Sequence, residues 1–363
     1  MTDPVSPDRF HQDPVLPADP VEALGAVGWS DRVAASFASA RADGVPARVV
    51  RVDRDRCLVS TSHGESTASA QPLPAVGDWV VLRPEPESNP PFVVNEVLPR
   101  WSALTRHRAG RATVEQVLAA NVDIVAVVAA LDHPVNHARL DRELVMAWDT
   151  AGRPIVILAK ADACRDPQAA ASEVAERHGG VDVIVTSALH RSGIAAVASA
   201  IGSSETIVLL GASGVGKSTL ANALLGHDAL DTGAVREGYK KGRHTTSARH
   251  LLALPLGGVL IDTPGVRSLG LYDVDEGIAL TFPDIDALIE QCRFTNCAHA
   301  GDAGCAIAAA VDDGSLDPER LVSWEKLQRE LARVEAQRDG RALAESHKAA
   351  RRFARSIRDQ PHR

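Results

Sequence analysis

The stretch from Ile207 to Thr219 carries the residues most suited to chemistry, reading I-V-L-L-G-A-S-G-V-G-K-S-T. A short apolar run precedes a glycine-rich turn, and a helical stretch follows to Leu225. Glycines let the backbone curl so that several N–H groups point at one anion, and the helix N-terminus adds the positive end of its dipole. This G-x-x-x-x-G-K-[ST] pattern between a strand and a helix predicts a nucleoside triphosphate site. The alternatives are a chance turn and a dinucleotide site, but the glycine spacing is wrong for the dinucleotide fingerprint.

Individual residues of this loop have separate expected roles. Lys217 is predicted to reach the β- and γ-phosphates, and the Ser218 hydroxyl is predicted to coordinate Mg²⁺. The residues predicted to contact the nucleotide here are Gly211, Ala212, Ser213, Gly214, Val215, Gly216, Lys217, Ser218 and Thr219.

Two further segments fit the γ-phosphate end of such a site. Asp262 and Gly265 form a D-x-x-G motif at the end of an apolar strand, about fifty residues after the loop. The Asp suits a link to Mg²⁺, and the Gly suits an N–H contact with the γ-phosphate. Between the two motifs, Thr245 and Thr246 lie in a polar loop where a switch threonine would cap Mg²⁺.

The A-K-A-D sequence at 159–162 is similar to the [NT]-K-x-D motif with which GTPases select guanine. The Asp of that motif accepts two hydrogen bonds from guanine, and adenine lacks this donor pair. We expect Lys160 to pack along the base, Asp162 to read it, and a backbone N–H after the next strand to meet the guanine oxygen. The residues predicted to bind the base are Ala159, Lys160, Ala161, Asp162, Ser187 and Ala188. The alternative is an ordinary surface Lys-x-Asp sequence, and Ala159 lacks the supporting hydrogen bond of the usual Asn or Thr.

The order of these motifs is unusual. Ordinary GTPases place the phosphate loop first and the base-reading sequence later, whereas here the base-reading sequence precedes the phosphate loop. This order predicts a circularly permuted domain, in which the sheet and the site persist while the chain ends move.

A metal-ligand pattern follows the D-x-x-G motif. Three thiolates and one imidazole fall within fourteen residues, and four such ligands predict a closed tetrahedral structural Zn²⁺ site. The predicted ligands are Cys292, Cys297, His299 and Cys305. The alternative is three unrelated buried cysteines with a surface histidine. Cys57 and Cys164 are isolated and are expected to be ordinary thiols.

Composition sets the class of protein. The chain has 363 residues, enough for two or three domains, with 45% hydrophobic and 24% charged residues. No run of eighteen apolar residues predicts a membrane span, and the acidic, proline-rich start is unlike a signal peptide. We therefore expect a cytoplasmic protein without disulfides. The net charge of −8 argues against a wholly basic nucleic-acid binder, so any RNA contact must be local.

The elements that must position these motifs fall into four predicted segments. A flexible leader covers 1–40, and an OB-type β-barrel domain covers 41–110. A circularly permuted α/β GTPase domain covers 111–275, and an α-rich zinc domain with a basic tail covers 276–363. Short alternating segments at 47–52, 56–61, 79–82 and 92–97 predict the barrel strands. Buried strands at 122–130, 154–158 and 181–186 alternate with helical stretches and predict a parallel sheet with helices on both faces.

Two basic segments are candidates for RNA contact. One runs from Arg100 to Arg111 between the barrel and the sheet, and the other is the tail from Arg341 to Arg363. Each is equally well explained as a solvated linker or a solvated helical face.

Taken together, the chain resembles the ribosome small subunit-dependent GTPase A family (RsgA, also called YjeQ or YloQ). The matching sequences are V-G-D-W-V at 76–80, S-A-L-T-R at 102–106, L-A-A-N-V-D at 118–123, the phosphate loop, R-H-T-T at 243–246, D-T-P-G-V-R at 262–267 and the Cys-Cys-His-Cys set. The resemblance implies a barrel, a permuted GTPase domain and a zinc domain. It implies a role in late maturation of the small ribosomal subunit, with GTP hydrolysis that this subunit stimulates. We expect the chain to bind GTP and GDP, to contact the subunit and its rRNA, and to be a monomer. Two departures from the family are Ala159 and the Asp302-Ala303 pair, which stands where Glu-Pro is common.

The residue that orients the attacking water is not the usual one. Many GTPases have a Gln directly after D-x-x-G, but this chain has Val266, whose side chain can neither donate nor accept a hydrogen bond. His244 in the switch loop is the nearest catalytic candidate by sequence, and the family resemblance indicates the same residue. The alternative is a loop histidine that contacts rRNA or stays solvated.

Three functions remain open from the sequence. The first is an rRNA-engaging assembly GTPase that hydrolysis releases from the subunit, and the second is a GTP-dependent binding module in which hydrolysis is incidental. The third, an ATPase or small-molecule kinase, is disfavoured by Asp162.

Overall fold

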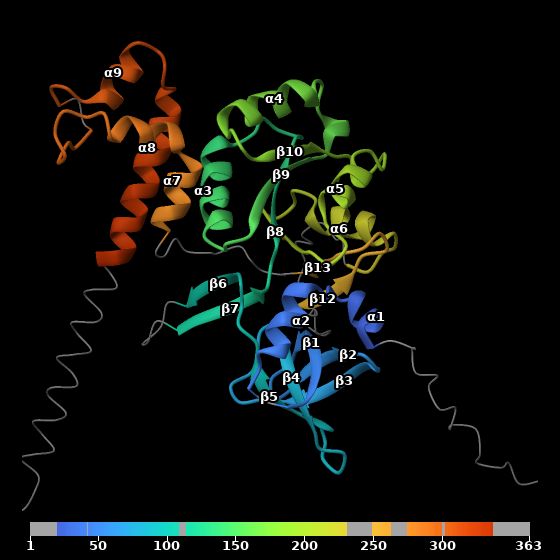
Figure 1. Cartoon of the computed structure of the whole chain (residues 1–363). Helices are drawn as coiled ribbons and strands as arrows, with labels where there is room; N and C mark the ends of the chain where they lie inside the picture. The colour runs from blue at the N-terminus through green and yellow to red at the C-terminus, as the bar shows by residue number, and fades with distance from the viewer. Residues whose placement is uncertain are drawn as a thin grey trace, which may run out of the picture.

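The computed structural model describes residues 20–41, 43–108, 114–230, 249–262, 274–299 and 302–336. The described residues form a β-barrel, a larger sheet covered by helices, and a helical region near the C-terminal end (Figure 1). Within these ranges, no helix has the length and the apolar character needed to cross a membrane.

Two helices precede the barrel, α1 (Pro20–Gly25) and α2 (Asp31–Ala38). Leu24 and Val33 are each 1% exposed, and the Trp29 ring lies edge-on to the Trp79 ring of the barrel at 5.3 Å between centroids. The predicted flexible leader is therefore wrong for this part of the chain, because its few apolar residues are spaced to cover the barrel. Residues 1–19 lie outside the described residues.

The OB-type barrel predicted from the sequence is confirmed. Its strands are β1 (Val45–Val52), β2 (Cys57–Thr61), β3 (Gly64–Ser69), β4 (Trp79–Pro84) and β5 (Phe92–Val97). They follow the order β1-β2-β3-β5-β4, and β1 pairs with β4 to close the barrel. β3 was not predicted because its residues G-E-S-T-A-S lack apolar alternation, and only Ala68 is fully buried.

A hairpin, not a linker, leaves the barrel. Its strands are β6 (Ala103–Arg108) and β7 (Val114–Ala120), which pair in antiparallel fashion. The domain boundary predicted at 110/111 lies outside the described residues, between these paired strands. Arg100, the first residue of the basic segment, donates 2.6 and 2.7 Å hydrogen bonds to the fully buried carboxylate of Asp78. This arginine therefore holds the fold together through Asp78, and its side chain is 33% exposed.

The larger sheet has the parallel core that the sequence predicted. Its strands are β8 (Ile124–Ala130), β9 (Arg153–Ala159), β10 (Asp182–Val185), β11 (Thr206–Leu210), β12 (His250–Ala253) and β13 (Val259–Asp262). The order is β10-β9-β8-β11-β13-β12, and β12 alone among these strands runs antiparallel to its neighbour β13. β12 also pairs with β1 at Arg51 and His250, so the sheet continues into the barrel (Figure 1).

Helices cover both faces of this sheet. They are α3 (His137–Trp148), α4 (Pro167–Arg177), α5 (Ile194–Ala200) and α6 (Lys217–Leu225). Val125 and Val127 of β8 belong to the apolar cluster that contains residues of α3 and α4. Ile124 and Ala126 belong to the cluster that contains residues of α5 and α6. Successive side chains of a strand point to opposite faces, so one strand supports both layers.

Arg48 joins the barrel to the strand that feeds the phosphate loop. Its guanidinium is 1% exposed, and it donates to the Val27 carbonyl at 2.5 Å and to Oγ1 of Thr206, the first residue of β11, at 2.7 Å. It also lies over the Trp79 ring at 5.1 Å. Burial lowers the pKa of Arg48 to about 10. The barrel and β11 are therefore held by one buried cation with satisfied donors.

The C-terminal region consists of α7 (Asp275–Thr281), α8 (Pro283–Ile289), α9 (Ala306–Asp312) and a last helix over 318–336. α7 packs closely on α3, since a Cβ built on Gly277 would lie 2.5 Å from the carbonyl oxygen of Val145. Glycine is therefore required where these two helices meet. Phe282 and Ile285 are fully buried in the same apolar cluster as α3.

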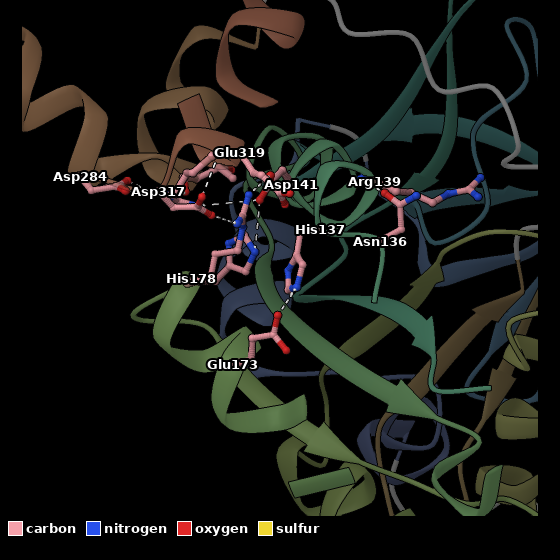
Figure 2. Close-up of polar contacts among 12 residues, drawn as sticks. Asn136, His137, Arg139, Asp141, Glu173, His178, Asp284, Asp317 and Glu319 are labelled. Atoms are coloured by element: carbon pink, nitrogen blue, oxygen red, sulfur yellow. Dashed lines mark hydrogen bonds and ion pairs between the residues drawn. The ribbon is translucent and has the colours of Figure 1, made fainter. Parts of the chain in front are cut away.

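A charged joint, formed by Asp141, Arg177, His178 and Arg320, ties this region to α3 and α4 (Figure 2). The Asp141 carboxylate is fully buried. Its oxygens lie 3.2 Å from Nη2 of Arg177, 3.3 Å from Nε2 of His178 and 3.8 Å from Nη1 of Arg320. One carboxylate is thus shared by cations from the sheet domain and from the C-terminal region.

Acidic residues at the edge of the charged joint form further ion pairs with both arginines. Arg320 donates to both oxygens of Asp284, at 2.5 and 2.8 Å, and Arg177 donates to Asp317 at 3.0 Å. Each arginine therefore has a carboxylate of its own besides the shared Asp141.

Candidate nucleotide and metal sites

The phosphate loop leaves β11 and enters α6, as the sequence predicted. Gly211, Gly214 and Gly216 have φ angles of 136°, 84° and 107°, in a region that favours glycine. A Cβ built on Gly211 would lie 2.4 Å from the Val128 carbonyl oxygen, so no other residue fits at that position. The backbone path of this loop therefore depends on the glycines.

Lys217 lies across this loop. Its Nζ donates to the carbonyls of Gly211 and Ala212, at 2.7 and 2.6 Å. Asp262, at the end of the adjacent strand β13, is half-buried, and burial raises its pKa while the charges of His250 and Lys217 lower it. The carboxyl ends of parallel strands share one edge of a sheet, so the Lys of the loop and the Asp of D-x-x-G meet there.

Oxygen atoms that could coordinate a hard cation lie at this same edge of the sheet. Ser218 is half-buried in the first turn of α6, and Asp262 ends β13. A hydroxyl and a carboxylate are the donor types that suit Mg²⁺. The predicted contacts Thr245, Thr246 and Gly265, and the catalytic candidate His244, lie outside the described residues.

The base-reading sequence lies beside the phosphate loop. Ala159 ends β9 and is 5% exposed, and a Cβ built on Gly216 would lie 3.8 Å from the Cβ of Ala159. Lys160 follows with a φ of 58°, and residues Ala161–Ala163 form a short 3₁₀ turn. Segments about fifty residues apart in the chain therefore meet at one sheet edge, which is what a single nucleotide site requires.

Asp162 is fixed by a partner that the motif does not specify. The Ser187 hydroxyl donates a short hydrogen bond to Asp162 Oδ1, and this bond is the main cause of the lowered pKa of the Asp162 carboxyl. Ser187 is itself held, since its N–H and carbonyl pair with Ser192 and its hydroxyl accepts from the His190 N–H. From the sequence we predicted that the Ser187-Ala188 backbone contacts the guanine oxygen. The hydrogen bond from the Ser187 side chain to Asp162 was not predicted, because the two residue types alone do not indicate it.

The four predicted metal ligands come together in the C-terminal region. Their ligand atoms all lie within 4.8 Å of one another. Those ligands are Cys292, Cys297, His299 and Cys305. His299 reaches the cluster with a φ of 59°, and its Nδ1 lies 3.6 Å from the sulfur of Cys292. Three sulfurs and one imidazole nitrogen at these separations suit a tetrahedral site that holds a metal by protein atoms alone.

Asp302, one of the two departures from the family sequence, supports this cluster. Its Oδ2 accepts a 2.9 Å hydrogen bond from the Ala298 N–H and lies 3.5 Å from the sulfur of Cys297. The carboxylate therefore fixes the turn between two ligands, and the departure leaves the ligand set intact.

Comparison with known proteins gives one consistent picture. The model of the RsgA GTPase family matches residues 97–272. A "small ribosomal subunit biogenesis GTPase RsgA" from Streptomyces coelicolor is 45% identical over 342 residues, covering 91% of this chain and 92% of that protein. A protein of the same name from Opitutus terrae is 44% identical, covering 85% and 90%.

Solved structures agree on the fold. The crystal structure of YjeQ from Thermotoga maritima matches with a TM-score of 0.60 and 25% identity, covering 79% of this chain and 98% of that one. The structure of YloQ, described as a circularly permuted GTPase, matches with a TM-score of 0.58, covering 81% and 97%.

Proposed function

Because this chain belongs to the RsgA GTPase family, we propose that it hydrolyses GTP to GDP and phosphate in the late maturation of the small ribosomal subunit. In this proposal the subunit and its rRNA are the partners, and contact with the subunit stimulates turnover. The names of the relatives from Streptomyces coelicolor and Opitutus terrae support the role in subunit biogenesis.

The observation that carries the proposal is that Ala159 lies beside the phosphate loop, since a Cβ built on Gly216 would lie 3.8 Å from the Ala159 Cβ. This arrangement brings a guanine-type K-x-D sequence to the loop although that sequence comes first in the chain. An ATPase or a small-molecule kinase has no need of a carboxylate at Asp162, since adenine offers no matching donor pair.

Each residue of the site then has a role in the proposed reaction. Asp162 accepts hydrogen bonds from guanine, and Lys160 packs along the base. Lys217 neutralises charge on the β- and γ-phosphates, while Ser218 and Asp262 hold Mg²⁺. When bound, Mg²⁺ offsets the negative charge that develops on the transferred phosphoryl group. The protein acts mainly by positioning and by electrostatic stabilisation.

For the C-terminal cluster we propose one Zn²⁺ with a structural role. The four protein ligands fill a tetrahedral shell, so no position is open for substrate. The donor set supports this assignment, because thiolates select soft or borderline metals over Mg²⁺ or Ca²⁺. A cytoplasmic location and a monomeric state complete the proposal, and a reducing compartment is one in which thiolate ligands persist.

Two binding measurements test the proposal. In competition against a fluorescent GDP, we expect GTP and GDP to displace the label at concentrations at least tenfold below those of ATP. In co-sedimentation, we expect a non-hydrolysable GTP analogue to retain the protein on purified small ribosomal subunits, and GDP to release it. Equal displacement by ATP, or no nucleotide-dependent retention, would contradict the proposed function.

A further inference from the structure

Lys160, in the base-reading sequence, has a backbone that its neighbours hold in place. Its φ of 58° lies in the left-handed region, which is disfavoured for residues with a Cβ. The N–H of Ala161 donates to the Thr186 carbonyl at 3.0 Å, and the N–H of Ala163 donates to the Lys160 carbonyl at 2.9 Å. These bonds fix the main chain, but the long side chain needs its own support to keep one direction.

Asp132 provides that support. Its Oδ2 accepts a hydrogen bond from Nζ of Lys160 at 2.7 Å, and each of the two side chains is 35% exposed. The hydrogen bond from Lys160 is the main cause of the lowered pKa of Asp132. Oδ1 lies 3.3 Å from Nδ1 of His133, so both carboxylate oxygens have a neighbour.

The sheet brings Asp132 to this place. β8 and β9 lie side by side with Ala130 opposite Ala159. One residue beyond β8, the N–H of Leu131 donates to the Ala159 carbonyl at 2.8 Å, so the pairing continues past the end of the strand. Asp132 comes next and lies beside Lys160, the first residue after β9. No motif contains Asp132, because the contact depends on which strand is the neighbour of β9.

Ala159 cannot support Lys160 in the same way. Its side chain is a methyl group without hydrogen-bonding atoms, and it lies near Gly216 of the phosphate loop, which has no side chain. The usual Asn or Thr would offer a polar group here. In the described part of the chain, the hydrogen bond that holds the Lys160 ammonium is the one to Asp132.

We propose that Asp132 is a positioning residue for guanine nucleotides, which holds the Lys160 side chain along the place of the base and so replaces the support that Asn or Thr would give at position 159. The inference rests on the proposed function, since it needs a base at this site. Asp132 acts through Lys160 and does not read the edge of the base. Its removal therefore weakens binding without changing the choice between bases.

The test is the full-length Asp132→Asn variant, which keeps the size of the side chain and removes its charge. Calorimetric titration with GDP and with inosine diphosphate, which lacks the 2-amino group, gives two dissociation constants. We expect both to rise by the same factor, roughly 2–5-fold as for an exposed ion pair, with their ratio unchanged. Asp55→Asn is the matched control, since Asp55 forms an exposed ion pair with Arg56 in the barrel at 2.9 Å. We expect it to leave both constants unchanged.

A second variant adds Ala159→Asn to Asp132→Asn. An amide at position 159 supplies the missing polar group, so we expect the double variant to regain most of the lost GDP affinity. Wild-type GDP affinity in Asp132→Asn, a loss confined to GDP, or no recovery in the double variant would overturn the proposal. A wild-type chain that binds neither nucleotide would overturn the proposed function instead, so the two failures are distinguishable.

Discussion

The hydroxyl of Ser187 donates a hydrogen bond to Asp162, which lies 25 residues earlier in the chain. The two residues follow the ends of neighbouring strands, β10 and β9. The bond is the main cause of the lowered pKa of the Asp162 carboxyl, and it fixes the position of Oδ1. A carboxylate that is fixed and charged before a base arrives needs less reorganisation to accept two hydrogen bonds from guanine.

Asp162→Asn should remove most of the discrimination between GTP and ATP, by roughly one to three orders of magnitude. An amide presents a donor where guanine also presents donors, so the match to guanine is lost. Competition of GTP and ATP for the same labelled nucleotide measures the change. Ser187→Ala serves as a comparison and should have a smaller effect, because it leaves the carboxylate in place. Identical competition curves for Asp162→Asn and wild type would refute guanine reading by this residue.

Cys297→Ser should lose the bound metal and loosen the C-terminal region while nucleotide binding persists, because the sheet has its own apolar core. Metal analysis and limited proteolysis measure these changes. The control is Cys164→Ser, since Cys164 is a half-buried thiol outside the ligand cluster. Full metal content and wild-type protease resistance in Cys297→Ser would show that the cluster is not a structural metal site.

Asp141→Asn should destabilise the junction between α3 and the C-terminal region by about 1–3 kcal/mol, since it removes the buried charge that Arg177 and Arg320 share while each arginine keeps a second carboxylate partner. Glu330→Gln is the control at the same junction. Glu330 pairs with Arg142 at 2.8 Å, but both side chains are about one-third exposed, so its loss should cost about 1 kcal/mol or less. Native-state hydrogen exchange in α3 and α8 reports the difference. Equal protection in the two variants would show that the charged joint does not hold the region in place.

Acid should weaken the fold through His178. Burial lowers the pKa of this imidazole to about 4 from an ordinary value of 6.5, so it is neutral in the folded protein at pH 5. The unfolded chain binds a proton there below pH 6.5, and stability falls as the pH drops from 6.5 to 4, by up to about 3 kcal/mol. His178→Gln should remove that part of the pH dependence. Parallel stability curves for wild type and variant between pH 7.5 and 5 would rule out this contribution.

The sequence predicted the parts of the fold that repeat a strong local pattern. Continuous apolar runs located β8, β9 and β11, and the glycine spacing located the phosphate loop. β3, α1 and α2 were missed because their stability comes from packing against the barrel and not from local apolar periodicity. The contacts Ser187–Asp162 and Asp132–Lys160 were missed for a related reason, since they depend on which strands are neighbours in the sheet.

His244 lies outside the described residues, so its role stays a prediction from the sequence. Val266 follows the D-x-x-G motif and cannot orient water, and His244 is the nearest side chain in sequence that can. His244→Ala should leave GTP binding and subunit binding near wild-type values while subunit-stimulated hydrolysis is lost. Single-turnover kinetics on preformed complexes separates the chemical step from binding. Stimulated hydrolysis at the wild-type rate would exclude the role.

GTP turnover by the wild-type chain, measured with and without purified small ribosomal subunits, tests the central claim most directly. Without a Gln after D-x-x-G, we expect slow hydrolysis by the isolated protein. With a small amount of the protein and an excess of small subunits, we expect GTP hydrolysis at least tenfold faster than by the protein alone. Large subunits in place of small ones, or ATP in place of GTP, should give no such increase. Turnover that is the same with and without small subunits would contradict a GTPase that acts on this particle.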